Sequence, residues 1–340
     1  MWHEKLIRAQ RDLHDRIGRR VRSAMSNSTS DQLAQVSREA CDDTIYVLDL
    51  AAEERLIQDL QEIFGTFCHL HVVCEGLEDC VLPCSSNQED APHFCLILDP
   101  VDGTRGLIYG KRSAWILSAV APVHDGKSLT MADLTCAVQT EIPTLRSSLV
   151  DQLVGIRGQG VQATTLDLDS GETSTWRPEP STAASVYGGF STICRFFPPG
   201  RDRLAALDDA LLLHLLGPPK GRAHVFEDQY LCTGGLIYQL LSGKDRFVAD
   251  LRGTLNGYRR EAGLEPALTC HPYDLCTALI ASELGVVLTQ PDGAPLSYAI
   301  DTDSEVSWCG YANQKIQHEV EESLQRLIPL HLVYRHNSED

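Results

Sequence analysis

An apolar run in the chain ends abruptly in the acidic segment DPVDGT, residues 99–104. Asp99 and Asp102 are spaced so that both carboxylates can converge on one point, and Gly103 permits a tight turn and close approach of a ligand to the backbone. Thr104 can begin a helix, whose first N–H groups favour phosphate. Carboxylate oxygens are hard ligands that select magnesium, calcium or manganese rather than zinc. The segment therefore predicts either a cation site or an ordinary capped turn.

Three further carboxylates stand where they could join this turn. Glu75 directly follows a short apolar run, so it too is expected at the end of a strand. Asp49 and Asp274 each precede a segment with helical periodicity. Aspartate is favoured at helix N-caps, so capping is the alternative interpretation for these two residues. The two roles can coexist in one side chain.

Composition limits the classes of function. The 340 residues are 43% hydrophobic and 22% charged, and no apolar stretch approaches the ~20 residues of a membrane span. The first twenty residues form a charged amphipathic pattern without the apolar centre of a signal peptide, so we expect a cytoplasmic protein. The formal charge of −18 argues against nucleic acid and anionic membranes as partners. The negative charge is compatible with a phosphorylated small molecule as ligand, provided that cations lie between the acidic site and the phosphate.

The twelve cysteines include no C-x-x-C pair. Because the chain is large and shows no secretory signal, we expect reduced thiols. Four cysteines cluster beside two histidines and raise the question of a soft-metal site: Cys68, Cys74, Cys80, Cys84, His69 and His71. Their spacing fits no zinc ribbon, so we interpret them as buried or incidental.

Periodicity places two helices early in the chain, at residues 2–25 and 49–64. Five segments then have the pattern of strands: 71–74, 94–98, 115–122, 133–140 and 152–158. Because no helix separates most of them, an antiparallel or mixed sheet packed on the helices is expected.

A stretch rich in turn formers at residues 167–183 is the candidate domain boundary. Beyond it, helical and extended patterns alternate. The expected helices are 206–216, 234–243 and 274–285, and the expected strands are 246–251 and 286–289.

Taken together, these pieces resemble the inositol monophosphatase superfamily, which includes fructose bisphosphatases and phosphoadenosine phosphatases. Its D-P-[IVL]-D-G-[TS] signature is matched at every position of residues 99–104. Its other signatures are approximated in order: D-x-V-T-x-x-D at 43–49, G-E-E at 74–76, a G-x-G-A hairpin at 157–160, W-D-x-A-A-G at 273–278 and a helix end at 282–287. The resemblance extends from about residue 40 to 315.

The resemblance implies a site and a chemistry. Two or three Mg²⁺ ions, with Mn²⁺ as an alternative, would be held by four carboxylates and one carbonyl: Glu75, Asp99, Asp102, Asp274 and the Val101 carbonyl. The ions would clamp the phosphate, acidify a water and stabilise the leaving alkoxide. Thr104, hydrogen-bonded to Asp49, would orient or deprotonate that water, and the N–H groups of Gly103 and Thr104 would cradle the phosphate.

The chain departs from the family pattern at several positions. Gly76 replaces the second glutamate of G-E-E, and Tyr46 and Tyr273 replace a threonine and a tryptophan. Ala267 stands where inositol phosphatases carry a glutamate that grips the inositol ring, in an ungapped count, and this weakens the case for inositol. Arg246 and Arg252 could line the pocket across the cleft, with Arg246 as the candidate substrate ligand and solvated surface charge as the alternative for both.

The fold class expected from the resemblance is α/β (α+β), a layered α/β/α/β/α sandwich of the sugar phosphatase type. Residues 1–181 would form an α+β domain with most of the metal ligands, and residues 182–340 a smaller α/β domain that supplies Asp274 and substrate specificity. A homodimer is what the resemblance suggests.

The expected function is a Mg²⁺-dependent phosphate monoesterase acting on a small sugar, cyclitol or nucleotide phosphate. Two alternatives remain open. One is a non-catalytic descendant that binds a metal or a phosphorylated ligand, which loss of Thr104 or Asp49 would have favoured. The other is a non-hydrolytic reaction on a phosphorylated substrate, such as elimination or transfer, which would give a product other than inorganic phosphate.

Overall fold

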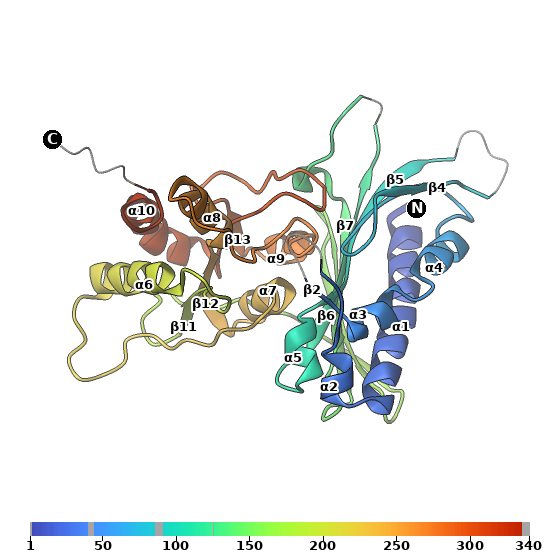
Figure 1. Ribbon diagram of the computed structural model, residues 1–340, viewed down its shortest axis with the longest axis horizontal. Coiled ribbons are helices and arrows are strands. Elements are labelled where there is room, and N and C mark those ends of the chain that lie inside the picture. The colour runs from blue at the N-terminus through green and yellow to red at the C-terminus, as the bar shows by residue number, and fades with distance from the viewer. Residues whose placement is uncertain (1, 40–43, 86–90, 125, 335–340) are drawn as a thin grey trace.

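The computed structural model describes residues 2–39, 44–85, 91–124 and 126–334 (Figure 1). Two sheets and three sets of helices alternate across the molecule, so that each sheet is covered on both faces (Figure 1). The layers run helix, sheet, helix, sheet, helix, and the predicted α/β sandwich is confirmed. None of the helices within the described ranges is long and apolar enough to cross a membrane.

The larger sheet has eight strands in the order β10-β9-β8-β7-β6-β5-β3-β4. Their bounds are β3 (His69–Cys74), β4 (Cys80–Leu82), β5 (His93–Asp102), β6 (Ala114–Pro122), β7 (Cys136–Ile142), β8 (Leu149–Ile156), β9 (Gly160–Asp167) and β10 (Thr173–Trp176). β3 and β5 pair in parallel and the other neighbours are antiparallel, which confirms the expected mixed sheet. A short 3₁₀ turn, η1 (Met131–Asp133), precedes β7.

Both faces of this sheet are apolar, which is why it is buried on both sides. Along β5, Leu96 and Leu98 point to one core, whereas Cys95 and Ile97 point to the other. The alternation follows from the two-residue period of a strand. β4, β9 and β10 were not predicted, and β10 lies inside the segment expected to be a linker, where it pairs with β9 at the edge of the sheet.

The first core lies between the larger sheet and the N-terminal helices α1 (Trp2–Asn27) and α4 (Leu56–Ile63), which cover one face (Figure 1). The predicted apolar stripe of α1 is confirmed, since Leu6, Leu13 and Ile17 are fully buried. Three short elements complete this region: α2 (Ser30–Leu33), β1 (Val36–Glu39) and β2 (Thr44–Tyr46), the last two forming an antiparallel ribbon.

The helix predicted over residues 49–64 is divided in the structure. α3 (Val47–Glu53) ends at Glu54, and Arg55 adopts a left-handed conformation with φ 63° before α4 begins. A helix cannot continue through this conformation, so the prediction of one continuous helix is wrong. Both α3 and α4 pack against α1, and α3 also contacts β5.

The second core fills the space between the two sheets. It contains α7 (Thr233–Leu241) and α9 (Ala278–Glu283), which lie between the sheets in Figure 1. The smaller sheet has the order β11-β12-β14-β13. Its strands are β11 (Phe190–Ile193), β12 (Asp245–Asp250), β13 (Val287–Thr289) and β14 (Trp308–Tyr311).

The third core lies beneath the outermost helices, α6 (Arg201–Leu216), α8 (Arg252–Glu261) and α10 (Gln314–His331). The predicted helices at 206–216 and 234–243 and the predicted strands at 246–251 and 286–289 are present. The larger sheet ends at Trp176 and the smaller one begins at Phe190. The division into domains at residue 181 stays a prediction.

Candidate metal centre

The parallel pairing of β3 and β5 positions the first two carboxylates. Cys74 lies opposite Leu98 in the register, and the Glu75 N–H donates to the Leu98 carbonyl at 3.2 Å. Glu75 and Asp99 therefore follow the last paired residues of two neighbouring strands and line the same cavity. This is the strand-end arrangement that the sequence predicted.

The acidic turn is held by its own backbone. The Val101 N–H donates to Asp99 Oδ1 at 2.9 Å, and an irregularity in the pairing of β5 with β6 falls between Asp99 and Asp102. Gly103 has φ 100°, and a side chain there would come within 3.1 Å of Cys232. Only glycine both adopts this positive φ readily and leaves room for Cys232. The helix α5 (Thr104–Ile108) begins at the next residue, Thr104, as predicted.

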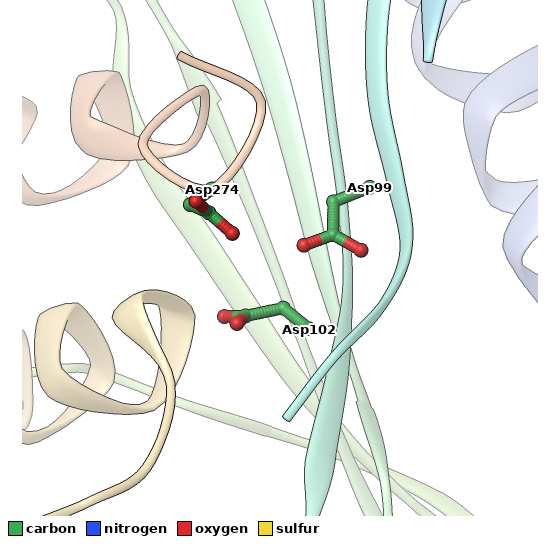
Figure 2. Close-up of side chains that lie close together, drawn as sticks. All are labelled: Asp99, Asp102 and Asp274. Atoms are coloured by element: carbon green, nitrogen blue, oxygen red, sulfur yellow. The ribbon is translucent and has the colours of Figure 1, made fainter. Parts of the chain in front are cut away.

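Asp274 reaches the site from a turn that precedes α9. Its Oδ2 accepts a hydrogen bond from the His271 N–H at 2.6 Å, which fixes the carboxylate. Asp274 does not cap the helix as the alternative interpretation required, because α9 starts only at Ala278. Figure 2 shows Asp99, Asp102 and Asp274 pointing toward one another across the space between β5 and this turn.

One ligand oxygen from each of Asp99, Asp102 and Asp274 lies within 4.8 Å of the others. Asp99 and Asp102 are only 1% and 6% exposed. Burial raises the pKa of both carboxyls well above the usual range, and the charge of neighbouring carboxylates raises it further. Three converging carboxylates in a buried setting are costly as anions unless a cation compensates them. Their hard oxygens fit Mg²⁺ or Mn²⁺.

Asp49 and Thr104 meet as predicted from the resemblance. The Thr104 hydroxyl lies 2.6 Å from Asp49 Oδ1 and 2.9 Å from the Val101 carbonyl. Asp49 is the third residue of α3, not its N-cap, and its Oδ2 accepts from the Tyr46 N–H at 2.7 Å. The carboxylate thus closes the first turn of α3 with one oxygen and holds Thr104 with the other.

α7 makes a contact with the centre that sequence reasoning missed. The Gly234 N–H donates to Asp102 Oδ2 at 2.5 Å. A β-carbon at Gly234 would lie 2.8 Å from the same oxygen, so the helix can approach Asp102 only with glycine at this position. The run Thr233-Gly234-Gly235 at the start of an apolar helix was the available signal.

Four buried thiols surround the carboxylates: Cys74, Cys232, Cys270 and Cys276. Burial raises the pKa of each thiol well above its usual value, and nearby aspartates raise it further. These thiols are therefore protonated at neutral pH, and Cys232 donates a hydrogen bond toward Asp102. Every cysteine in the described ranges is free, as expected. Within the same ranges, only the three aspartates form a group of close metal-ligand atoms.

Arg246, the predicted substrate ligand, is not brought to this cavity. Its guanidinium donates to the backbone carbonyls of Ser185 and Tyr187, the former at 2.9 Å. Arg252 does line the cavity, and its guanidinium forms a paired contact with Asp250. Arg252 was a candidate from the sequence, whereas Arg105, which lines the cavity from the side of α5, was not singled out there.

The departures from the family pattern have structural counterparts. Gly76 has φ 76°, in the left-handed region that favours glycine, so the turn after β3 accounts for it. Ala267 exchanges backbone hydrogen bonds with the side chain of Asn256 in α8, at 2.7 and 2.8 Å, while Leu268 lines the cavity. Asp43, which begins one of the resembling motifs, lies outside the described residues.

Two of the resembling motifs contact each other away from the centre. Glu283, at the end of α9, accepts hydrogen bonds from the Gly158 N–H at 2.8 Å and the Gly160 N–H at 3.0 Å. The 157–160 hairpin of the larger sheet is thereby fixed to the helix that follows Asp274. The contact keeps the Asp274 turn in place against the sheet.

No protein-family model matches the chain, and no curated protein matches its sequence. Solved structures do match its fold. Fructose-1,6-bisphosphatase of Leishmania major aligns with a TM-score of 0.61 and 15% identity, over 95% of this chain and 93% of that one. The extragenic suppressor protein SuhB of Bartonella henselae aligns with 0.62 and 14%, over 94% and 98%.

An inositol monophosphatase of Zymomonas mobilis aligns with a TM-score of 0.58 and 14% identity, over 96% of this chain and 99% of that one. These alignments span both sheets and all three helical layers. At such identities the alignments show similarity of fold alone. The chain has the fold of the inositol monophosphatase and fructose-1,6-bisphosphatase superfamily.

Proposed function

We propose that the chain is a Mg²⁺-dependent phosphate monoesterase that hydrolyses a small phosphorylated metabolite. The observation that carries the proposal is the convergence of Asp99, Asp102 and Asp274 beside the hydrogen-bonded pair of Thr104 and Asp49. A cation-binding group and a proton-accepting group thus line one cavity. The phosphatases among the structural neighbours support the same class of reaction.

Glu75, Asp99, Asp102 and Asp274, with the Val101 carbonyl, would hold the ions. When bound, the ions supply charge neutralisation for the phosphate and raise the acidity of water. The Thr104 hydroxyl donates to Asp49, so its lone pairs are left to accept a hydrogen bond from a water. A proton taken at Thr104 Oγ1 can pass to Asp49 Oδ1, at 2.6 Å. The Tyr46 N–H keeps Asp49 oriented for this role.

The phosphate would be bound at the turn that carries these ligands. We propose the N–H groups of Gly103 and Thr104 as its backbone donors, as the resemblance implies. Arg246 is withdrawn from the substrate-binding set, because its guanidinium is engaged by two backbone carbonyls elsewhere. The proposed partner is a small phosphorylated substrate, and a homodimer with two domains per chain remains part of the proposal.

The test is release of inorganic phosphate from a panel of sugar, cyclitol, nucleotide and aryl phosphates, with Mg²⁺, with Mn²⁺ and with a chelator. We expect release only with metal, and a loss of at least a hundredfold in Asp99→Asn. Asp169→Asn is the matched control, since Asp169 is exposed and lies outside the cavity. Size-exclusion chromatography with light scattering tests the homodimer.

Each alternative predicts a different result. A non-catalytic descendant would bind Mg²⁺ and phosphate esters without releasing phosphate from any panel member. A non-hydrolytic enzyme would consume a phosphorylated substrate and give a dehydrated or transferred product, detectable by ³¹P NMR. Either result would overturn the hydrolase proposal.

A further inference from the structure

A series of contacting aromatic rings and guanidinium groups lines the cavity, from Tyr46 through Arg105, Phe197 and Phe196 to Arg252. The Arg105 guanidinium lies 5.2 Å from the ring centre of Tyr46 and 5.0 Å from that of Phe197. The Arg252 guanidinium lies 4.5 Å from the ring centre of Phe196. The two phenylalanine rings are 5.0 Å apart and nearly perpendicular, at 89°. Such cation–π and edge-to-face contacts are favourable.

Both ends of the series are anchored. Arg252 is 5% exposed, and its Nε and Nη2 donate to the two Asp250 oxygens at 2.8 and 2.6 Å. At the other end, Arg105 Nε donates to the Tyr46 hydroxyl at 2.9 Å. Arg105 belongs to α5, which follows β5 of the larger sheet, and Arg252 begins α8, which follows β12 of the smaller sheet. The phenylalanines are therefore held from both sides of the cavity.

The space that the series leaves is small. The cavity has a volume of about 80 Å³. Pockets for small molecules are usually roughly 300–1,000 Å³. The volume is appropriate to a phosphoryl group and its ligands, so a larger leaving alcohol has to contact the lining side chains, which include Phe196 and Phe197.

The lining of the cavity includes apolar side chains beside its polar ones. The apolar residues include Phe196, Phe197, Leu231 and Leu268. Among the described lining residues, Thr269 has a buried hydroxyl without a hydrogen-bond partner and is one polar group available to an alcohol. A hydroxyl of a sugar or cyclitol that lies against the two phenylalanine rings would lose its water without replacement, which is unfavourable. A flat apolar face would instead pack on the rings.

We propose that Phe196 and Phe197, held between Arg105 and Arg252, determine the leaving-group specificity of the site. The residues select a phosphate ester whose alcohol presents a flat, apolar face and reject a polyhydroxylated ring. The inference rests on the proposed phosphatase function, and it narrows the substrate class of that same site.

The test measures binding of phosphonates, which are not hydrolysed, to the Mg²⁺-loaded protein by calorimetry. Methylphosphonate probes the phosphoryl site alone, phenylphosphonate adds a flat face, and a sugar phosphonate adds hydroxyls. We expect the wild type to bind phenylphosphonate roughly tenfold more tightly than the sugar phosphonate. In Phe196→Ala and Phe197→Ala this preference should fall to threefold or less, while methylphosphonate affinity stays within about twofold.

Phe226→Leu is the matched control, because Phe226 is an exposed ring outside the cavity and should keep the wild-type preference. Phe196→Leu and Phe197→Leu serve if an alanine variant unfolds. A wild type that prefers the sugar phosphonate, or phenylalanine variants with an unchanged preference, would overturn the inference while leaving the phosphatase proposal intact. If the wild type binds no phosphonate and no inorganic phosphate with Mg²⁺, the phosphatase proposal fails and this inference fails with it.

Discussion

The Thr104 hydroxyl lies 2.6 Å from the Asp49 carboxylate, although the two residues belong to different helices and are 55 positions apart in the sequence. We expect Thr104→Ala to lower kcat for phosphate release by roughly 10²–10⁴, the usual contribution of a proton-accepting group. Mg²⁺ affinity should change by less than about threefold, because the aspartate cluster is untouched. Thr104→Ser keeps the hydroxyl and should restore most activity. Equal activity in Thr104→Ala and the wild type would exclude Thr104 from proton transfer.

Mg²⁺ should stabilise the fold through the aspartate cluster. At a hundredfold excess over Kd, binding to the native state alone adds about 2.7 kcal/mol to the free energy of unfolding. Asp102→Asn should abolish this gain. Without metal the variant should be at least as stable as the wild type, because one of the two buried carboxylates of the three-aspartate cluster becomes neutral and the Gly234 N–H keeps an acceptor. Thermal unfolding over a Mg²⁺ titration measures both effects, and an unchanged Mg²⁺-dependent rise in Tm would contradict the assignment.

Gly234→Ala should weaken the metal site without removing a ligand. The added methyl would lie 2.8 Å from Asp102 Oδ2 and 2.7 Å from Leu117 Cδ2, so the carboxylate must move. Displacement of a group that orients a ligand typically costs roughly 10–100-fold in metal affinity. Gly257→Ala in α8 is the control, since its methyl would meet no atom within 4 Å. Calorimetric titration with Mn²⁺ compares the two, and equal affinities would show that the contact does not position Asp102.

His14 predicts an acid limit to stability. It is fully buried between Ser118 and Thr140, each 2.8 Å from a ring nitrogen. The Ser118 hydroxyl donates to Gln10 and so accepts from Nε2–H, which makes Nδ1 the acceptor for Thr140. Burial lowers the pKa of His14 from 6.5 to about 3.

The unfolded chain therefore binds more protons between these pH values, and stability falls as pH drops from 6.5 towards 3. The loss from this group reaches about 4–5 kcal/mol. In His14→Gln the slope of unfolding free energy against pH in this window should be markedly smaller. Urea unfolding at a series of pH values measures it, and equal slopes would contradict the neutral assignment.

The buried carboxyl of Asp245 predicts the opposite pH dependence, in which stability falls as pH rises. It is 1% exposed, and neither carboxylate oxygen has a hydrogen-bond partner among the described residues. Burial, and secondarily the charge of Asp228, raise its pKa to about 7, although Lys244 and Arg112 oppose this. Between these pH values the folded chain binds one more proton at Asp245 than the unfolded chain does. The resulting contribution to the free energy of unfolding is complete below the usual carboxyl pKa and is lost as pH rises to 7.

Asp245→Asn removes the titration and should gain stability relative to the wild type as pH rises from 4 to 8, by up to about 4 kcal/mol. The difference between the two proteins in urea unfolding at pH 4, 6 and 8 is the measurement. A difference that does not change with pH would mean that Asp245 is charged throughout.

The parts of the site that sequence predicted are those fixed by local spacing. The 99–104 turn, the strand end at Glu75 and the helix start at Thr104 depend on neighbouring residues, and the structure contains all three. The resemblance supplied the long-range pairing of Asp49 with Thr104, which no periodicity contains. Arg246 was misplaced because β12 directs its side chain to residues 185–187, and strand direction was not available from composition.

What the sequence did not reveal depends on packing between distant segments. The contact of Gly234 with Asp102 and the series from Tyr46 to Arg252 form only when the layers assemble. The division of the predicted 49–64 helix rests on one residue, Arg55, whose left-handed backbone no propensity indicates. β9 and β10 contain mostly polar residues, so neither has the sustained apolar alternation of a predicted strand. β10 also lies in the 167–183 segment that resembles a linker.

The reactivity of the buried thiols around the aspartates also offers a way to measure local opening of the site. A protonated, enclosed thiol reacts with an alkylating reagent only when the surrounding structure opens. Cys80 and Cys84 are partly exposed, so they react as an internal reference. The buried thiols of Cys74, Cys232, Cys270 and Cys276 react only when the structure around the aspartates opens. Mass-spectrometric alkylation rates would thus follow how rigidly the acidic turn and the Asp274 turn are held, in the unaltered chain and without any introduced probe.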